Sequence, residues 1–340
     1  MEGELTEDMG SGIMDDGSSE NSENPINYTF LAIQCAWYSF VLILGITGNV
    51  YIILTVWCRK DMCSTTNLFI VNLAFSDLGI LLISLPAEFI KDYVGWPFDK
   101  LTCQIFAPLN EVFFCVSILT LTVITIERFR AICRPFKPHL TQRKAKVIII
   151  IVWFVSYLTV GFPMSFLMDV QESQNHLRCG PKWSGDLQRR IHTCFIATLI
   201  IVPLFITAGG YAAIVSAMKR QSARIRARAN SLSGATVTFR HDQFRLEKNA
   251  ELIKMLLLIV VVFWICMLPL TLLALAIDFG GIDPTTKAVD LLYTLGISLF
   301  FSNSAFNPVA VYMMSSELRK GLYAFLDRIS KYFDYKFIEV

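Results

Sequence analysis

Seven long apolar segments constrain the fold of this 340-residue chain more than any other feature of its sequence. The hydrocarbon core of a bilayer is about 30 Å thick and is crossed by about 20 apolar residues of helix. A helix in a soluble core is seldom apolar on all sides for that length. We therefore predict an all-α membrane protein, a seven-transmembrane helix bundle. Its helices are expected at residues 31–57, 67–89, 104–132, 147–168, 191–218, 252–277 and 288–314.

The net charge of +2 hides an uneven distribution of the 30 basic and 28 acidic side chains. The loops after the first, third and fifth segments, with the C-terminal tail, hold 23 of the basic residues, and the other side holds 7. Because basic loops favour the cytoplasmic side, we predict a plasma-membrane protein with an extracellular N-terminus and a cytoplasmic C-terminus. The charge pattern also excludes a nucleic-acid binder that relies on a general positive field.

Residues 1–30 are expected to form an acidic, disordered extracellular tail. The first 25 residues contain eight acids, no base and no apolar stretch, a composition typical of disorder. We expect no cleavable signal peptide there, so the first helix would act as the insertion signal. Asn27-Tyr28-Thr29 is a glycosylation sequon on the predicted extracellular side.

The seven-helix unit, residues 31–314, is followed by a third unit, residues 315–340. Apolar residues recur there at helical spacing with basic residues between them, at Leu318, Leu322, Phe325, Leu326 and Ile329. This pattern predicts a short amphipathic helix that lies on membrane lipids, followed by a short cytoplasmic tail.

Several polar residues fall inside the predicted membrane helices, where ionisable groups are costly and are functional candidates by default. Asp77 lies in the middle of the second segment, and Ser117 and Asn49 lie at similar depth in the third and first. In the seventh segment, three polar residues share one helix face: Asn303, Ser304 and Asn307. Such oxygen ligands suit a small hard cation. A hydrogen-bonded packing network without an ion explains the pattern equally well.

The third segment carries a cysteine at one end and an acid–base pair at the other. Cys103 precedes Arg128 by 25 residues, which is about 37 Å of helix, so this helix crosses the whole membrane. Among the predicted extracellular stretches only Cys103 and Cys179 offer thiols, and we expect them to pair. Glu127 and Arg128 by themselves could be boundary charges that reach for water.

Taken together, these residues resemble the rhodopsin-like (class A) G-protein-coupled receptors over nearly the whole chain, from about residue 31 to 326. The matching motifs occur in the family's order and spacing. They are Gly48-Asn49, Leu73-Ala74-Phe75-Ser76-Asp77, Trp96-x-Phe98, Glu127-Arg128-Phe129, Trp153, Pro203, Tyr211, Phe263-x-x-Cys266-x-x-Pro269 and Asn303-Ser304-x-x-Asn307-Pro308.

The resemblance implies a receptor that activates a heterotrimeric G protein when its sixth segment swings outward. It implies that Arg128 and Tyr211 meet the G protein, with Phe263, Pro269 and Pro308 at flexible or switching positions. The only cofactor it implies is an allosteric sodium ion. Its site would comprise Asp77, Ser117, Asn303, Ser304 and Asn307.

Three positions depart from the family's motifs. Phe129 replaces the tyrosine after the acid–base pair, so a hydroxyl is lost. Met267 stands where the family has a tryptophan switch, and a flexible thioether replaces a rigid indole. Val311 replaces the tyrosine of the seventh segment, with Tyr312 one place later, about 100° around the helix. This ending is similar to that of bombesin and endothelin receptors and favours a peptide receptor.

The predicted ligand is a basic peptide. Asn110 stands where the amine receptors have an aspartate, and the seventh segment lacks the deep lysine of light receptors. The membrane charge next door is Glu111, about 12 Å below Cys103. Three interpretations of Glu111 remain open: protonation, a local hydrogen bond or a cationic ligand. The other ligand contacts are expected at Asn110, Phe114, Glu88, Asp278 and Tyr293.

Acidic residues outside the membrane favour the cationic ligand, because an acidic vestibule attracts cations. A solvated rim without such a role, a cationic small molecule and constitutive activity without a ligand remain alternatives. A seven-helix channel or pump is more distant, and scattered histidines give an enzyme little support. Arrestin is expected to use hydroxyl groups of the third cytoplasmic loop, at Ser222, Ser231, Ser233, Thr236 and Thr238.

Overall fold

A computed structural model describes residues 28–58, 64–134, 138, 140–173, 176–231, 236–314 and 319–321. Within them, seven helical spans are long and apolar enough to cross a membrane, which confirms the predicted bundle. The helices and strands, in chain order, are α1 (Tyr28–Cys58), α2 (Thr65–Gly79), α3 (Leu85–Tyr93), α4 (Lys100–Cys133), α5 (Gln142–Ser156), α6 (Phe162–Leu167), β1 (Met168–Ser173), β2 (His176–Pro181), α7 (Asp186–Ser231), α8 (Thr236–Phe279) and α9 (Lys287–Met314).

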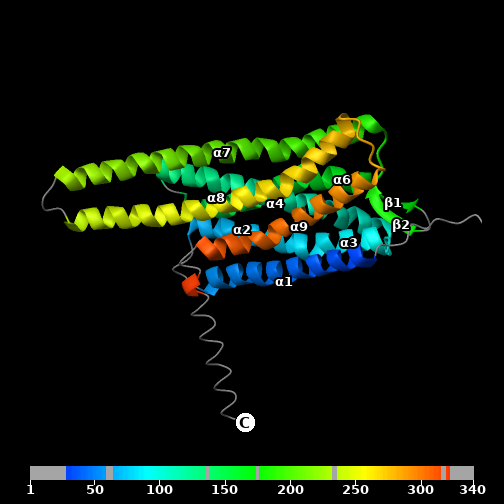
Figure 1. Ribbon diagram of the computed structural model, residues 1–340, viewed down its shortest axis with the longest axis horizontal. Helices are drawn as coiled ribbons and strands as arrows, with labels where there is room; N and C mark the ends of the chain where they lie inside the picture. The colour runs from blue at the N-terminus through cyan, green and yellow to red at the C-terminus, as the bar shows by residue number, and fades with distance from the viewer. Residues whose placement is uncertain are drawn as a thin grey trace, which may run out of the picture.

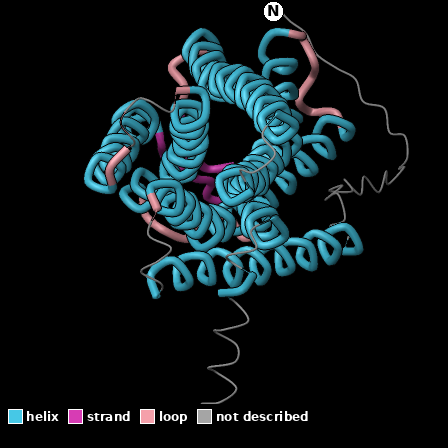
Figure 2. The backbone as a smooth tube through the Cα atoms, turned by 90° about the vertical axis from the view of Figure 1, so that its left-hand side faces the viewer, coloured by secondary structure: helices cyan, strands magenta, loops and turns pink. Residues whose placement is uncertain are grey.

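The helices run roughly side by side along the long axis of the molecule (Figure 1). The antiparallel strands β1 and β2 lie at one end, and α7 and α8 project beyond the other helices at the opposite end. Viewed from that opposite end, the strands appear behind the helices, within the outline of the bundle (Figure 2). We call the end with the strands the disulfide end, for the bond described below.

The second and fourth spans are each interrupted by a π-helical turn. These turns are η2 (Ile80–Ser84) between α2 and α3, and η3 (Tyr157–Gly161) between α5 and α6. Pro86 and Pro163 are the second residues of α3 and α6, just after the turns. Because proline has no N–H and its ring clashes with the carbonyl four residues earlier, the local winding of the helix changes there.

Helices α7 and α8 are longer than the predicted segments at residues 191–218 and 252–277, with 46 and 44 residues. The predicted segments end where charged residues begin. Lysine, arginine, glutamate and alanine are good helix formers in water, so the helices continue beyond the apolar stretch. Apolarity therefore marks the part that crosses the membrane and leaves the helix ends undetermined.

Some predictions concern residues outside the described part of the chain. These are the sequon residue Asn27, most of the acidic tail and the hydroxyl side chains of Ser231, Ser233, Thr236 and Thr238. Of the predicted C-terminal amphipathic helix, the structure describes residues 319–321, which are helical.

Polar side chains lock the helices together inside the bundle. Asn72 of α2 donates to the Thr120 hydroxyl of α4 at 2.8 Å and accepts from the Trp153 indole of α5, also at 2.8 Å. Asn49 of α1 donates to the Ser304 carbonyl of α9 at 2.9 Å. Large apolar side chains cover the outside of the bundle, as expected for faces in contact with lipid; Trp57, Phe166 and Phe205 are examples.

We predict that Asn72→Ala destabilises the protein by about 0.6 kcal/mol for each helix–helix hydrogen bond lost, with an upper value of about 1.7 kcal/mol. Trp153→Phe removes only the indole donor and should cost less. The measurement is the unfolding midpoint of the purified protein for both single variants and the double variant. Strictly additive effects would contradict a shared Asn72–Trp153 bond.

Candidate functional site

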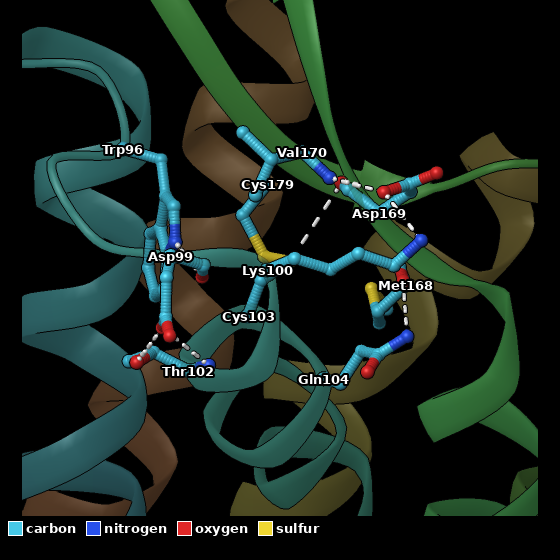
Figure 3. The surroundings of a disulfide bond; sticks show 10 residues. All are labelled: Trp96, Asp99, Lys100, Thr102, Cys103, Gln104, Met168, Asp169, Val170 and Cys179. Carbon is cyan, nitrogen blue, oxygen red and sulfur yellow. Dashed lines mark hydrogen bonds and ion pairs between the residues drawn. A yellow bond between two sulfur atoms is a disulfide. The ribbon is translucent and has the colours of Figure 1, made fainter.

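A disulfide joins Cys103, in the first turn of α4, to Cys179 of β2, with 5.7 Å between their Cα atoms, and confirms the predicted pair. Figure 3 shows two further contacts between α4 and β1. Lys100 forms a 3.1 Å ion pair with Asp169, and this contact lowers the pKa of the Asp169 carboxyl. Gln104 donates to the Met168 carbonyl at 3.3 Å. The strand pair is therefore fixed to the start of α4.

A cavity of about 750 Å³, which includes space open to solvent, lies among α4, α7, α8 and α9. Its size falls in the range of ligand sites, and its lining is mostly apolar with a few polar groups, as is usual for such sites. The lining residues are Asn110, Glu111, Phe114, His192, Thr193, Ile196, Ala197, Ile200, Met267, Leu270, Thr271, Ala274 and Phe300. Three of the six residues predicted to contact the ligand are among them.

Glu111 contacts a histidine that also lines the cavity. The carboxylate Oε2 of Glu111 lies 3.3 Å from Nε2 of His192, and the two side chains remain 24% and 23% exposed. His192 also lies against the Trp183 ring, with 5.2 Å between ring centroids. This local partner corresponds to one of the three open interpretations of Glu111. Sequence reasoning missed it because His192 falls at the edge of a predicted segment, far from Glu111 along the chain.

Asn110 supplies a second polar group beside Glu111. Its side-chain oxygen is buried and accepts no hydrogen bond from any residue that the structure describes. A buried polar atom without a partner costs about 1–3 kcal/mol. A hydrogen-bond donor that entered the cavity would offset this cost.

The other three residues predicted to contact the ligand are not among the lining residues. Asp278 is buried, forms a 2.9 Å ion pair with Arg189 and accepts from the Thr193 hydroxyl. Glu88 pairs with Lys91 at 2.6 Å. Tyr293 of α9 is 39% exposed. Several acids at the disulfide end thus already have partners, and the expected acidic vestibule is weaker than the sequence alone indicated.

The floor of the cavity is aromatic. The Phe114 ring is stacked on Phe263, with 6.0 Å between centroids and 10° between planes, and lies 5.6 Å from Phe300. Met267, also on the floor, is 3% exposed and precedes Pro269 within α8. A ligand in the cavity would therefore touch the part of α8 where the proline removes a helix hydrogen bond.

A buried polar cluster lies deeper in the bundle. Asn307 donates to one Asp77 oxygen at 2.9 Å, and the Ser304 hydroxyl lies beside the same carboxylate. Ser117 differs from the expectation, because its hydroxyl meets Ser76 at 2.9 Å and the Phe113 carbonyl at 3.1 Å. The α2 and α9 helices thus bring Asp77, Ser304 and Asn307 together, whereas Ser117 of α4 bonds to Ser76, the residue before Asp77.

Unpaired oxygens indicate that this cluster fits a cation. Within the described part of the chain, side-chain oxygens of Asp77, Asn303 and Asn307 are buried without a hydrogen-bond partner. Asp77 is completely buried, and an uncompensated carboxylate there would be costly. Oxygen ligands around one carboxylate suit a small hard cation such as sodium.

At the end opposite the disulfide, Glu127 binds several neighbours at once. It accepts hydrogen bonds from its neighbour Arg128 and from Thr65 and Thr66 of α2, the latter two at 3.4 and 3.3 Å. The Glu127–Arg128 pair of α4 is thus anchored to the start of α2. This arrangement is tighter than that of two independent boundary charges.

Other predicted switch residues pack around this end. Tyr211 is buried against Thr125 of α4. The Arg134 guanidinium lies 5.9 Å from the centre of the Phe129 ring. Pro308 lies where a side chain at Gly48 would meet it at 2.7 Å, so α1 and α9 approach closely. Val311 is 1% exposed, and Tyr312 is half-buried at the next position.

Seven membrane-crossing helices, the disulfide and the cavity above a buried polar cluster define the molecule as a seven-transmembrane receptor. The family described as "7 transmembrane receptor (rhodopsin family)" matches residues 48–312. The chain belongs to this family, and it is a multi-pass membrane protein. Members of the family are receptors, not enzymes.

Three receptors illustrate its relatives. Neuropeptide FF receptor 2 of Rattus norvegicus is 29% identical over 308 residues, which cover 85% of this chain and 71% of that receptor. The QRFP-like peptide receptor of Branchiostoma floridae is 28% identical over 304 residues, or 86% and 77% of the two chains. Neuropeptide FF receptor 1 of Homo sapiens is 26% identical over 352 residues, or 95% and 80%.

We predict that sodium stabilises the purified receptor through Asp77. At a concentration ten times its Kd, a ligand that binds only the folded state adds about 1.4 kcal/mol, so the unfolding midpoint should rise by a few degrees in sodium chloride relative to choline chloride. Asp77→Asn should abolish this difference, and Asp278→Asn, which changes another buried acid, should retain it. Equal responses of the two variants would contradict sodium binding at Asp77.

Proposed function

We propose that this receptor binds a basic extracellular peptide in the cavity at the disulfide end and activates a heterotrimeric G protein at the opposite end. The observation that carries the proposal is the carboxylate of Glu111, which faces the cavity beside the unpaired oxygen of Asn110. The relatives support a peptide ligand, since their names include neuropeptide FF and a QRFP-like peptide.

The cation of the ligand would bind Glu111 in place of His192. The Glu111–His192 contact is partly exposed and 3.3 Å long, and exposed ion pairs contribute about 1 kcal/mol or less. A lysine or arginine side chain can replace it at low cost. The remainder of the peptide would contact the surrounding helix ends.

Activation would follow from contacts on the cavity floor. A ligand shifts a conformational equilibrium only through different affinities for the two states. The floor residues Phe114 and Met267 connect the cavity to α8, and Pro269 provides the flexible point for outward movement of that helix. The G protein would then meet Arg128 and Tyr211 between the projecting ends of α7 and α8.

The basic loops support a cytoplasmic location of the end opposite the disulfide in the plasma membrane. Arrestin would bind after phosphorylation of the hydroxyl residues of the predicted third cytoplasmic loop, including Ser222, which lies within α7. Sodium at Asp77 would act as an allosteric ligand.

A nucleotide-exchange assay tests the function. We expect that a basic peptide, added to receptor and G protein reconstituted together in lipid, accelerates GDP release. An analogue in which glutamine replaces each basic residue should be much weaker. An equally potent analogue would contradict recognition of a basic ligand, and ion currents from the receptor in a planar bilayer without G protein would favour a channel.

Glu111→Gln should reduce the potency of a basic agonist by about 10- to 150-fold, the equivalent of the 1.5–3 kcal/mol of a hydrogen bond to a charged group. The variant should also respond equally to the peptide and to its glutamine analogue. Potency is measured by calcium and cAMP signals at matched surface expression. Glu172→Gln, in the exposed part of β1, is the matched control. Unchanged potency of Glu111→Gln would exclude this residue as the cation site.

A further inference from the structure

A second cavity, which the proposed function does not use, lies between α4 and α5 at the end opposite the disulfide. Its volume is about 640 Å³, including space open to solvent. Five of its eight lining residues are aliphatic, one is proline, and two are charged. They are Val123, Ile126, Glu127, Arg130, Ala131, Pro138, Leu140 and Ile148.

The two charged residues of this cavity differ in their surroundings. Glu127 is already held by Arg128 and the Thr65 and Thr66 hydroxyls. Arg130 is exposed, and its guanidinium forms no ion pair or hydrogen bond with the described part of the chain. The cavity therefore offers one free cation next to an apolar interior.

The sequence around the cavity strengthens this positive character. Between residues 126 and 148 the only acid is Glu127, and seven residues are basic. The lining residue Leu140 is followed by Thr141, the N-cap of α5, whose first turn contains no acid. Arg143, Lys144 and Lys146 are exposed there. Cations at a helix N-terminus are unfavourable unless an anion is near.

The neighbouring surface is apolar, as expected for contact with lipid. Ile126 on α4 is 46% exposed, and Val147 and Ile150 on α5 are 54% and 67% exposed. Ile126 itself lines the cavity. A molecule in the bilayer can therefore reach the cavity without first crossing an aqueous compartment.

We propose that one anionic phospholipid of the surrounding bilayer docks in this α4–α5 cavity. An acyl chain packs on the aliphatic lining residues Val123, Ile126 and Ile148. The headgroup phosphate binds the Arg130 guanidinium, for which a phosphate is a well-matched partner because both can form two parallel hydrogen bonds. The bases at the start of α5 attract the same headgroup. Since Glu127 lines the cavity and holds Arg128, the lipid contacts the helix segment that carries the proposed G-protein switch.

The experiment measures lipid bound to the purified full-length receptor by native mass spectrometry. Phosphatidylserine and phosphatidylcholine with identical acyl chains are offered in equal amounts. We expect one phosphatidylserine to be retained preferentially. Arg130→Gln should reduce this preference about five-fold, which corresponds to about 1 kcal/mol for one basic residue near an anionic lipid. Arg134→Gln removes a guanidinium at the C-cap of α4, four residues after Arg130 and outside the cavity lining, and should have a smaller effect.

A second variant and a second ligand complete the test. Ala131→Leu leaves the charge unchanged but fills part of the cavity, and it should also reduce retention of phosphatidylserine; thermal unfolding midpoints verify that both variants are folded. Equal losses in Arg130→Gln and Arg134→Gln would overturn the proposal in favour of general surface attraction. Arg130-dependent binding of free oleate, without such binding of phosphatidylserine, would overturn it in favour of a soluble fatty acid.

Discussion

In the hydrocarbon core of a bilayer, each polar group needs a partner within the protein, because water is not available. Helices satisfy the backbone, and the few polar side chains must then find one another between the helices. Asn72 does so by joining α2 to α4 and α5, and Asn49 by joining α1 to α9. The position of each helix in the bundle therefore depends on a small number of buried amides, around which the apolar side chains pack.

Several of the buried side-chain oxygens that lack a partner in the described part of the chain lie at the predicted functional sites. Asn110 has one beside the cavity, and Asp77, Asn303 and Asn307 have others in the polar cluster. Each such atom favours any state or ligand that supplies a donor or a cation. Phe114 lines the cavity and is stacked on Phe263 of α8. Binding above and ion occupancy below can thus act on the same helices.

The seven spans could be predicted from the sequence because a long apolar run is a local property. The distribution of basic residues among the loops then identified the predicted extracellular stretches, and the disulfide could be predicted because only two cysteines lay in them. Nothing comparable singled out the polar pairs between distant segments. His192 and Glu111 are 81 residues apart, and Arg189 and Asp278 are 89 apart. Such contacts depend on how α7 packs against α4 and α8. The ends of α7 and α8 were also missed, because helix propensity continues after the apolar residues stop.

Glu111 and Asp278 differ in their capacity to receive a cationic ligand. Asp278 has a side chain that is 7% exposed, and it holds two partners, Arg189 at 2.9 Å and the Thr193 hydroxyl. Glu111 is 24% exposed, and its polar partner among the described residues is His192, at 3.3 Å. A ligand cation therefore gains more at Glu111, where it displaces a weak contact, than at Asp278, where it must replace a strong one. This difference supports the proposal that a ligand cation binds deep in the cavity, close to Phe114 and α8.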